Sequence, residues 1–341
     1  MKSNPNSFNS SRRTFVQQSS ILLAAAILPF PFTASTSIHM TNNPHFDVII
    51  IGGSYSGLAA GMSLGRALRK VLIIDGGNPC NKQTPHSHNF LTQDGQTPAA
   101  IASLAKEQVE KYKTVTFRND LAVSGLQTTN GFEIATQSGS TFSAKKLIFA
   151  TGIKDVMPEI EGFSDCWGVS VIHCPYCHGY EYSNEKTGIL TNGDVAYEVS
   201  RLISNWTKDL TVFTNGIAEF APNQTQKLSE HGIMINESVI DHFEHNNGYL
   251  RNIVFKDGSK TPITAIYARP EFEQHCAIPE QLGCELTEQG HISVDPFQKT
   301  TIRGVFACGD NTTFMRSVAN SVAMGTLAGV MTNKEIIEDE F

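Results

Sequence analysis

The chain has 341 residues, seven of them cysteine, and a formal net charge of −7 at pH 7. The acidic balance and the lack of Lys/Arg runs argue against a nucleic acid or an anionic membrane as partner, and no apolar stretch beyond the N-terminal leader reaches membrane-spanning length. Seven cysteines are too few for a scaffold held together by disulfides, whereas a chain of this length can form two domains.

Residues 1–39 have the pattern of a twin-arginine signal peptide. Arg12 and Arg13 precede an apolar run at 21–28, which is too short to span a bilayer but fits the apolar region of a signal sequence. The pattern predicts an exported, periplasmic protein. Twin-arginine export carries folded, cofactor-loaded proteins, which fits a protein that binds a cofactor. If translation starts at Met40 instead, the protein is cytoplasmic.

The first predicted elements form a dinucleotide-binding unit. An apolar run at 46–51 predicts a buried strand, and a glycine-rich turn follows at 52–57. A helix at 58–69 and a second strand at 71–74 complete the unit, which ends at an acidic residue able to bind a ribose. The cofactor-binding candidates in this unit are Gly52, Gly53, Ser54, Tyr55, Ser56, Gly57 and Asp75.

Three further elements repeat or complete this pattern. A strand at 146–149 ends in a turn of small residues, and a second strand–helix–strand cycle covers 188–213. Near the C-terminus, a strand at 304–308 precedes a helix at 318–331, whose N-terminus can face a flavin. These turns add Thr151, Gly152, Gly309, Asp310, Arg316 and Ser317 to the cofactor-binding candidates.

The order of the elements predicts an α/β fold with two Rossmann-like domains of the FAD/NAD(P)-binding type, the second inserted in the first. The FAD-binding domain is expected at 44–155 and 264–341, and the inserted NAD(P)-type domain at 156–263.

Residues 174–181, Cys-Pro-Tyr-Cys-His-Gly-Tyr-Glu, lie between the two nucleotide-binding cycles. A Cys-x-x-Cys pair forms a small disulfide loop and its thiolate pKa is readily lowered, so the segment predicts thiol–disulfide exchange with a flavin as electron partner. A zinc site, a c-type haem attachment motif and a purely structural disulfide are the alternative interpretations. The pair His86 and His88 does not make a metal site, and none is predicted. We interpret the remaining cysteines as small core residues: Cys80, Cys166, Cys276, Cys284 and Cys308.

The ordered motifs GGSYSG, ATG, CPYCHGYE and GVFACGDN resemble those of the thioredoxin reductase-like, FAD-dependent pyridine nucleotide-disulfide oxidoreductases. The resemblance is strongest to the branch that carries CPYCHGYE, which includes the gliotoxin-type dithiol oxidases. It implies a homodimer with FAD, in which Cys177 faces the flavin and Cys174 exchanges with the substrate. It also implies that His178 transfers protons, that Asn89 lies near the isoalloxazine and that Val123 meets the adenine.

The second cycle lacks the features that hold NADPH in this family. Thr191 and Asn192 stand where glycines are expected, and residues 213–216 offer neither a base for NADP nor an acid for NAD. NADPH binding is therefore doubtful.

We expect an FAD-dependent enzyme that oxidises a small dithiol or a thioredoxin-like protein and passes the electrons to FAD, then to oxygen or another acceptor. The alternatives are an NADPH-dependent thioredoxin-disulfide reductase and a degenerate flavin-binding scaffold without turnover.

Overall fold

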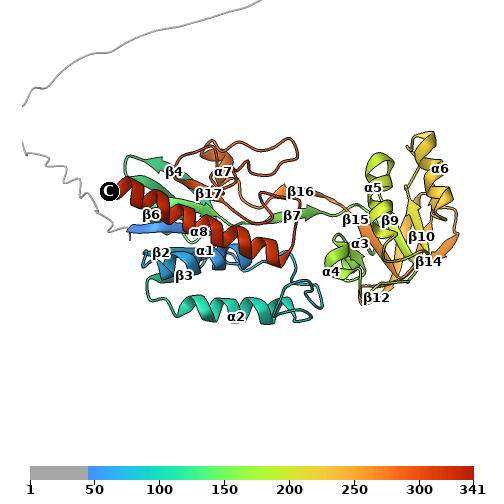
Figure 1. Ribbon diagram of the computed structural model, residues 1–341, viewed down its shortest axis with the longest axis horizontal. Coiled ribbons are helices and arrows are strands. Elements are labelled where there is room, and N and C mark those ends of the chain that lie inside the picture. The colour runs from blue at the N-terminus through green and yellow to red at the C-terminus, as the bar shows by residue number, and fades with distance from the viewer. Residues whose placement is uncertain (1–44) are drawn as a thin grey trace, which may run out of the picture. The chain divides into compact units, whose positions relative to one another are not determined.

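The structure is a computed structural model that describes residues 45–341 (Figure 1). The signal peptide predicted at 1–39 and the alternative start at Met40 lie outside the described residues and stay predictions. Among the helices of residues 45–341, none combines the length and the apolar character that crossing a bilayer requires.

The first domain contains a seven-stranded sheet with a parallel centre. β1 (His45–Ile51) lies between β2 and β6 and pairs with both in parallel. Alternate residues of β1 enter two hydrophobic cores, for example Ile49 in one and Ile50 in the other, so both faces of the strand are buried. The other strands are β2 (Val71–Asp75), β3 (Val115–Asn119), β4 (Ala122–Thr128), β5 (Gly131–Thr136), β6 (Thr141–Phe149) and β17 (Val305–Ala307).

Helices α1 (Tyr55–Arg66) and α8 (Val318–Glu340, red in Figure 1) pack closely in this domain. Their contact depends on glycine, since a Cβ on Gly325 would lie 2.0 Å from the carbonyl oxygen of Ser56. The remaining helices of the domain are α2 (Pro98–Glu110) and α7 (Ile278–Gln281).

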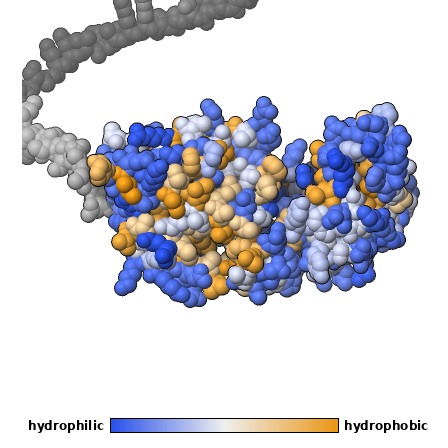
Figure 2. Space-filling view, in the orientation of Figure 1, coloured by the Kyte–Doolittle hydropathy of each residue, from blue (hydrophilic) through white to orange (hydrophobic). Residues whose placement is uncertain are grey.

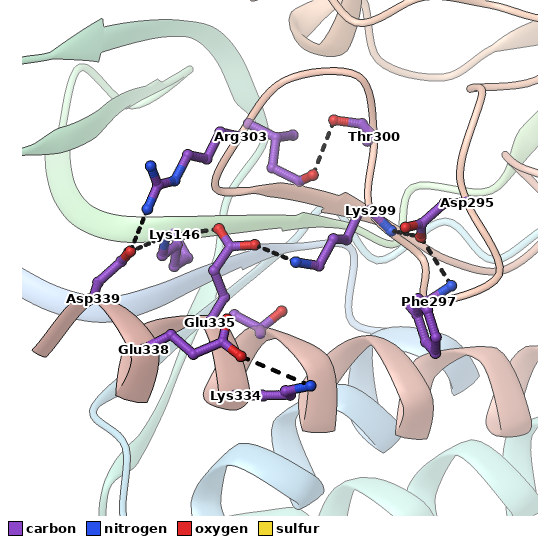
Figure 3. A network of polar contacts seen from close by, with 12 residues as sticks. Lys146, Asp295, Phe297, Lys299, Thr300, Arg303, Lys334, Glu335, Glu338 and Asp339 are labelled. Atoms are coloured by element: carbon purple, nitrogen blue, oxygen red, sulfur yellow. Dashed lines mark hydrogen bonds and ion pairs between the residues drawn. The ribbon is translucent and has the colours of Figure 1, made fainter. Parts of the chain in front are cut away.

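The last turns of α8 are fixed by a network of charged side chains (Figure 3). The buried Lys146 Nζ lies 2.8 Å from Glu335 Oε1 and 2.6 Å from Asp339 Oδ2. Lys299 Nζ lies 2.8 Å from the other Glu335 oxygen, and Arg303 pairs with Asp339 at 2.6 Å. Because these contacts join the helix to β6 and to the loop before β17, α8 continues past residue 331, where the sequence predicted its end.

The inserted domain contains a five-stranded parallel sheet of order β11-β10-β9-β15-β8. β9 (Thr187–Leu190), α5 (Gly193–Ile203) and β10 (Leu210–Phe213) form the second nucleotide-binding cycle that the sequence predicts. The other elements are α3 (Phe163–Cys166), β8 (Val171–Ile172), α4 (Pro175–His178), α6 (Pro222–Glu230), β11 (Met234–Asn236), β15 (Ala265–Ala268) and a three-stranded sheet of β12 (Ile240–Asn246), β13 (Tyr249–Phe255) and β14 (Lys260–Pro262).

An antiparallel pair, β7 (Ile153–Val156) and β16 (Glu271–Gln274), connects the two domains. The boundary predicted between residues 263 and 264 lies too early in the chain. β15 follows that boundary, yet it pairs with β8 and β9 of the inserted sheet. The inserted domain therefore extends to the end of β15.

Candidate active site

The glycine-rich turn after β1 brings the chain against the end of β6. Gly52 has a φ of 105°, and a Cβ there would lie 2.2 Å from the carbonyl oxygen of Ala150. A Cβ on Gly57 would lie 1.9 Å from the carbonyl oxygen of Gly52, so neither position accepts a larger residue. Ser54 precedes α1 without a side-chain capping bond, which leaves the N–H groups of the first helical turn open to an anionic ligand.

A cavity of about 1000 Å³ opens at this turn. It is large enough for a dinucleotide cofactor. The predicted cofactor contacts in its wall are Gly52, Gly53, Ser54, Tyr55, Ser56, Asp75, Thr151, Gly152, Asp310, Arg316 and Ser317. Cys177 and His178 of the dithiol segment line the same cavity, so the structure brings the first nucleotide-binding unit and the dithiol to one site.

Three other predicted residues lie just behind or beside this wall. Gly57 supports the turn, and Gly309, with a φ of 91°, lies so close to Ser56 that a Cβ would approach its Oγ to 2.7 Å. Cys174 is half-buried and does not line the cavity. The two cysteines of the motif thus have different surroundings.

Asn89 and Val123, which the resemblance placed at the flavin, are exposed and do not line the cavity. Val123 lies at a register shift in the β4–β5 pairing, which leaves backbone groups at this position without a strand partner. Asn89 belongs to a hairpin whose neighbouring residues Ser87 and His88 line the cavity instead. This hairpin therefore brings Ser87 and His88 to the site.

Asp310 and Arg316 meet in the wall of the cavity, where Arg316 is held by an ion pair with Asp155. Its Nη1 and Nη2 lie 2.7 and 3.0 Å from the two carboxylate oxygens of Asp155, and its Nε lies 3.5 Å from Asp310 Oδ2. Burial raises the pKa of Asp310, and the charge of Arg316 opposes this shift. Arg316 thus positions the loop before α8, in addition to lining the cavity.

Cys174 and Cys177 form a disulfide at the start of the short helix α4, with their Cα atoms 5.3 Å apart. Cys174 is the residue before the helix, and Pro175 follows at its first position. The bend of the chain at this point keeps the two sulfur atoms within bonding distance. Only Cys177 faces the cavity.

The histidines on either side of the disulfide are both uncharged at neutral pH. Burial, followed by the nearby His88, lowers the pKa of His178 to about 4. Burial, followed by Arg316 and His178, lowers the pKa of His173 to about 3, and its buried Nε2 has no hydrogen-bond partner in the described part of the chain. A neutral histidine beside a thiol can accept its proton. Sequence reasoning missed His173, for which the position directly before Cys174 was the only signal.

Cys166, Cys284 and Cys308 are buried, as predicted for small core residues. Cys80 is not a core residue, because it opens onto the cavity with its Sγ 3.9 Å from Asp310 Oδ2. The surrounding protein and then the Asp310 charge raise the pKa of Cys80 to about 11. It is therefore a protonated thiol and not a second nucleophile.

The second nucleotide-binding turn is closed by its own side chain. Asn192 Oδ1 accepts hydrogen bonds from the backbone N–H groups of Gly193 at 2.9 Å and Glu219 at 3.0 Å. The N–H of Gly193 is the first of α5. Without the Asn192 side chain, it would be free to bind a phosphate. Thr191 and the end of β15 line a small cavity of about 10 Å³ beside this turn.

Other polar groups near this turn also form hydrogen bonds within the protein, and Glu237 adds a negative charge that would repel a phosphate. Thr214 Oγ1 donates to the carbonyl of Gly216 at 2.6 Å, and Glu237 accepts from the N–H of Ala218 at 2.6 Å. Arg269 at the end of β15 lines the small cavity and is the cation in its wall.

Comparisons with known proteins agree with this arrangement. A family model described as pyridine nucleotide-disulphide oxidoreductase matches residues 46–325. The chain belongs to this family.

Similar proteins include the thioredoxin reductase sirT of Leptosphaeria maculans, which is 31% identical over 84% of this chain and 93% of its own. The thioredoxin reductase tcpT of Claviceps purpurea (strain 20.1) is 28% identical over 88% of this chain and 97% of its own. Among solved structures, an oxidoreductase from Agrobacterium tumefaciens has a TM-score of 0.81 at 35% identity and covers 86% of this chain and 99% of its own.

Family membership confirms the predicted class. The protein is a thioredoxin reductase-like oxidoreductase with two Rossmann-like domains. The first cavity fits the FAD of this family by its size, by the open N–H groups of α1 and by the carboxylate of Asp75 at the end of β2. The second turn, where Asn192 occupies the first N–H of α5, is the feature from which we propose the electron donor.

Proposed function

We propose that this protein is an FAD-dependent oxidoreductase that oxidises dithiols. The observation that carries the proposal is the second nucleotide-binding turn, where Asn192 Oδ1 occupies the first N–H donor of α5, at Gly193, that a nicotinamide nucleotide would need. Electrons then enter through the Cys174–Cys177 disulfide and leave to oxygen or another acceptor.

The lost contacts at the second turn support the proposal that NADPH binds weakly. A charge-assisted hydrogen bond contributes about 1.5–3 kcal/mol, and a phosphate at this turn would lose the Gly193 donor and the usual basic contacts. Losing two such bonds weakens binding by more than about a hundredfold.

The disulfide supplies the chemistry toward the substrate. A substrate thiolate attacks Cys174 Sγ, the Cys174–Cys177 bond breaks, and Cys177 leaves as a thiolate. The second substrate thiol then displaces Cys174 and closes the substrate disulfide, so two electrons move from the substrate to the protein pair. The neutral His178 accepts the proton that the attacking thiol releases. FAD bound in the first cavity supplies a two-electron acceptor for the reduced pair.

The second candidate is an NADPH-dependent disulfide reductase. The names of sirT and tcpT favour it, and Arg269 offers one cation near the second turn. Against it stands the hydrogen bond by which Asn192 closes the second turn.

Anaerobic stopped-flow absorbance of the flavin separates the candidates. We expect dithiothreitol to bleach the flavin quickly and NADPH to reduce it slowly, without saturation at millimolar concentration. An Asn192→Gly variant serves as the matched control, because freeing the Gly193 donor should speed reduction by NADPH without changing reduction by dithiothreitol. Saturable NADPH reduction of the wild type at micromolar concentration would favour the reductase, and no reduction by either donor would favour a scaffold without turnover.

The partners and the compartment are part of the same proposal. We infer a small dithiol or a thioredoxin-like protein as substrate, a homodimer as the assembly, and the periplasm as the compartment. Exposed apolar side chains such as Val330 and Ile337 on α8 support a homodimer. On the face drawn in Figure 2, apolar residues gather over the first domain, while the inserted domain is mostly hydrophilic.

A further inference from the structure

His88 lies at the dithiol on a hairpin with fixed geometry. The N–H of Ser87 donates to the carbonyl of Gln96 at 2.8 Å, and the N–H of Gly95 donates back to Ser87 at 2.9 Å. Asp94 Oδ1 accepts from the N–H of Asn89 at 2.7 Å, which closes the hairpin tip. These bonds hold the His88 side chain in the wall of the cavity that Cys177 and His178 also line.

Carboxylates flank both ring nitrogens of His88. Nε2 lies 3.4 Å from Glu181 Oε1, and Nδ1 lies 3.8 Å from Asp94 Oδ1. The side chains become more exposed along this series, from 22% for His88 to 37% for Glu181 and 66% for Asp94. On the inner side, His88 is close enough to His178 to affect its titration.

His178 needs a further proton acceptor. A base whose pKa lies near 4 holds a proton only briefly at neutral pH, and each substrate dithiol that is oxidised releases protons beside it. His88 lines the same cavity as His178, and its Nε2 lies 3.4 Å from the exposed Glu181, so a proton that reaches His88 has a route to solvent.

We propose that His88, paired with Glu181, forms the outer half of a proton relay that carries protons between His178 and solvent during dithiol exchange. The inference rests on the proposed dithiol oxidation. When a substrate thiol attacks Cys174, its proton passes to His178, then to His88, and leaves through the exposed carboxylates. His88 acts through His178 and is a relay residue, whereas His178 directly follows Cys177 in the chain and lines the cavity together with it.

His86 provides a matched control on the same hairpin. Its ring lies 6.4 Å from that of His88, but its Nδ1 is bonded to the carbonyl of Gly95 at 3.0 Å and it does not line the cavity. If the hairpin has only a structural role, replacing His86 or His88 by alanine should slow flavin reduction equally. If His88 is part of a relay, only its replacement should slow the reduction.

The test measures anaerobic reduction of the flavin-loaded protein by dithiothreitol between pH 5 and pH 9. We expect His88→Ala to retain its flavin absorbance and to be reduced at least about tenfold more slowly than the wild type, with a changed pH profile. Added imidazole should restore much of the rate in His88→Ala and leave His86→Ala unchanged. Glu181→Gln is a conservative change at an exposed position. Like His88→Ala, it should slow flavin reduction, and it should enlarge the solvent deuterium isotope effect on this rate.

The outcomes separate the relay from the proposed function. A wild-type rate and pH profile in both His88→Ala and Glu181→Gln would overturn the relay while leaving dithiol oxidation intact. Equal losses in His86→Ala and His88→Ala, without imidazole rescue, would also overturn it. If the wild-type flavin is reduced by NADPH and not by dithiothreitol, the proposed function fails first, and the relay fails with it.

Discussion

The two cysteines of the disulfide differ because of where the chain places each of them. Cys177 lines the cofactor cavity, and Cys174, one turn earlier, does not. The neutral His178 follows Cys177 directly and lies in the same wall. We therefore propose that an external substrate attacks Cys174 and that Cys177 is the sulfur atom on the cofactor side.

This asymmetry predicts different reactivity in the two single variants. In flavin-loaded Cys177→Ser, the lone thiol of Cys174 should react with an aromatic disulfide reagent and keep a stable mixed disulfide, because no second thiol expels it. Cys174→Ser should react about tenfold more slowly or worse, since access to its remaining thiol is limited. The measurement is the rate of coloured thiolate release, with the double variant as background. Faster labelling of Cys174→Ser would reverse the assigned roles.

At the scale of elements, α8 connects the cofactor site to the sheet. Its first turn follows Ser317 in the cavity wall, and its last turns carry Glu335 between Lys146 and Lys299. Burial alone would raise the pKa of Glu335, but hydrogen bonds from the two lysines lower it overall. The buried carboxylate is therefore charged. If it is replaced by a neutral group, Lys146 loses one of its two ion-pair partners.

We predict that Glu335→Gln destabilises the protein and that Glu338→Gln on the same helix does not (Figure 3). Removing one partner of a buried ion pair costs about 3 kcal/mol. Glu338 forms only an exposed pair with Lys334 at 3.7 Å, worth about 0.5 kcal/mol or less. Denaturant unfolding of both flavin-loaded variants checks the difference, and equal midpoints would show that the network contributes little.

At the scale of the whole molecule, the two half-buried histidines beside the disulfide make stability depend on pH. His173 and His178 have pKa values of about 3 and 4 in the folded protein, below the ordinary value of 6.5. The unfolded chain therefore binds more protons below pH 6.5, and stability rises with pH across this window. The contribution is fully present above the unfolded pKa and is lost as the pH falls toward the folded values.

We therefore predict that the melting temperature falls on acidification from pH 7 to pH 4 and that His173→Asn reduces this slope. The variant can be less stable at every pH, so the slope and not the absolute melting temperature is compared. Thermal melts in a buffer series of constant ionic strength measure it. Parallel curves for the variant and the wild type would show that His173 does not titrate in this way.

Much of the architecture was predictable because local patterns encode it. The two strand–helix–strand cycles, the insertion of one domain in the other and the family followed from short apolar runs, glycine positions and the CPYCHGYE segment. The domain boundary, placed after residue 263, was not predictable, because β15 is a short apolar run that either sheet could have accepted. Only strand pairing in three dimensions assigned it.

The sequence by itself determined the turn at Gly52, the Cys174–Cys177 pair and the loss of glycine at Asn192, because each depends on neighbours in the chain. Only the tertiary structure decided that His88 meets Glu181 and that Arg316 pairs with Asp155. Such contacts join segments that are far apart along the chain, and no periodicity or spacing records them. They arise when the fold brings polar side chains from separate segments together, where a buried charge requires a partner.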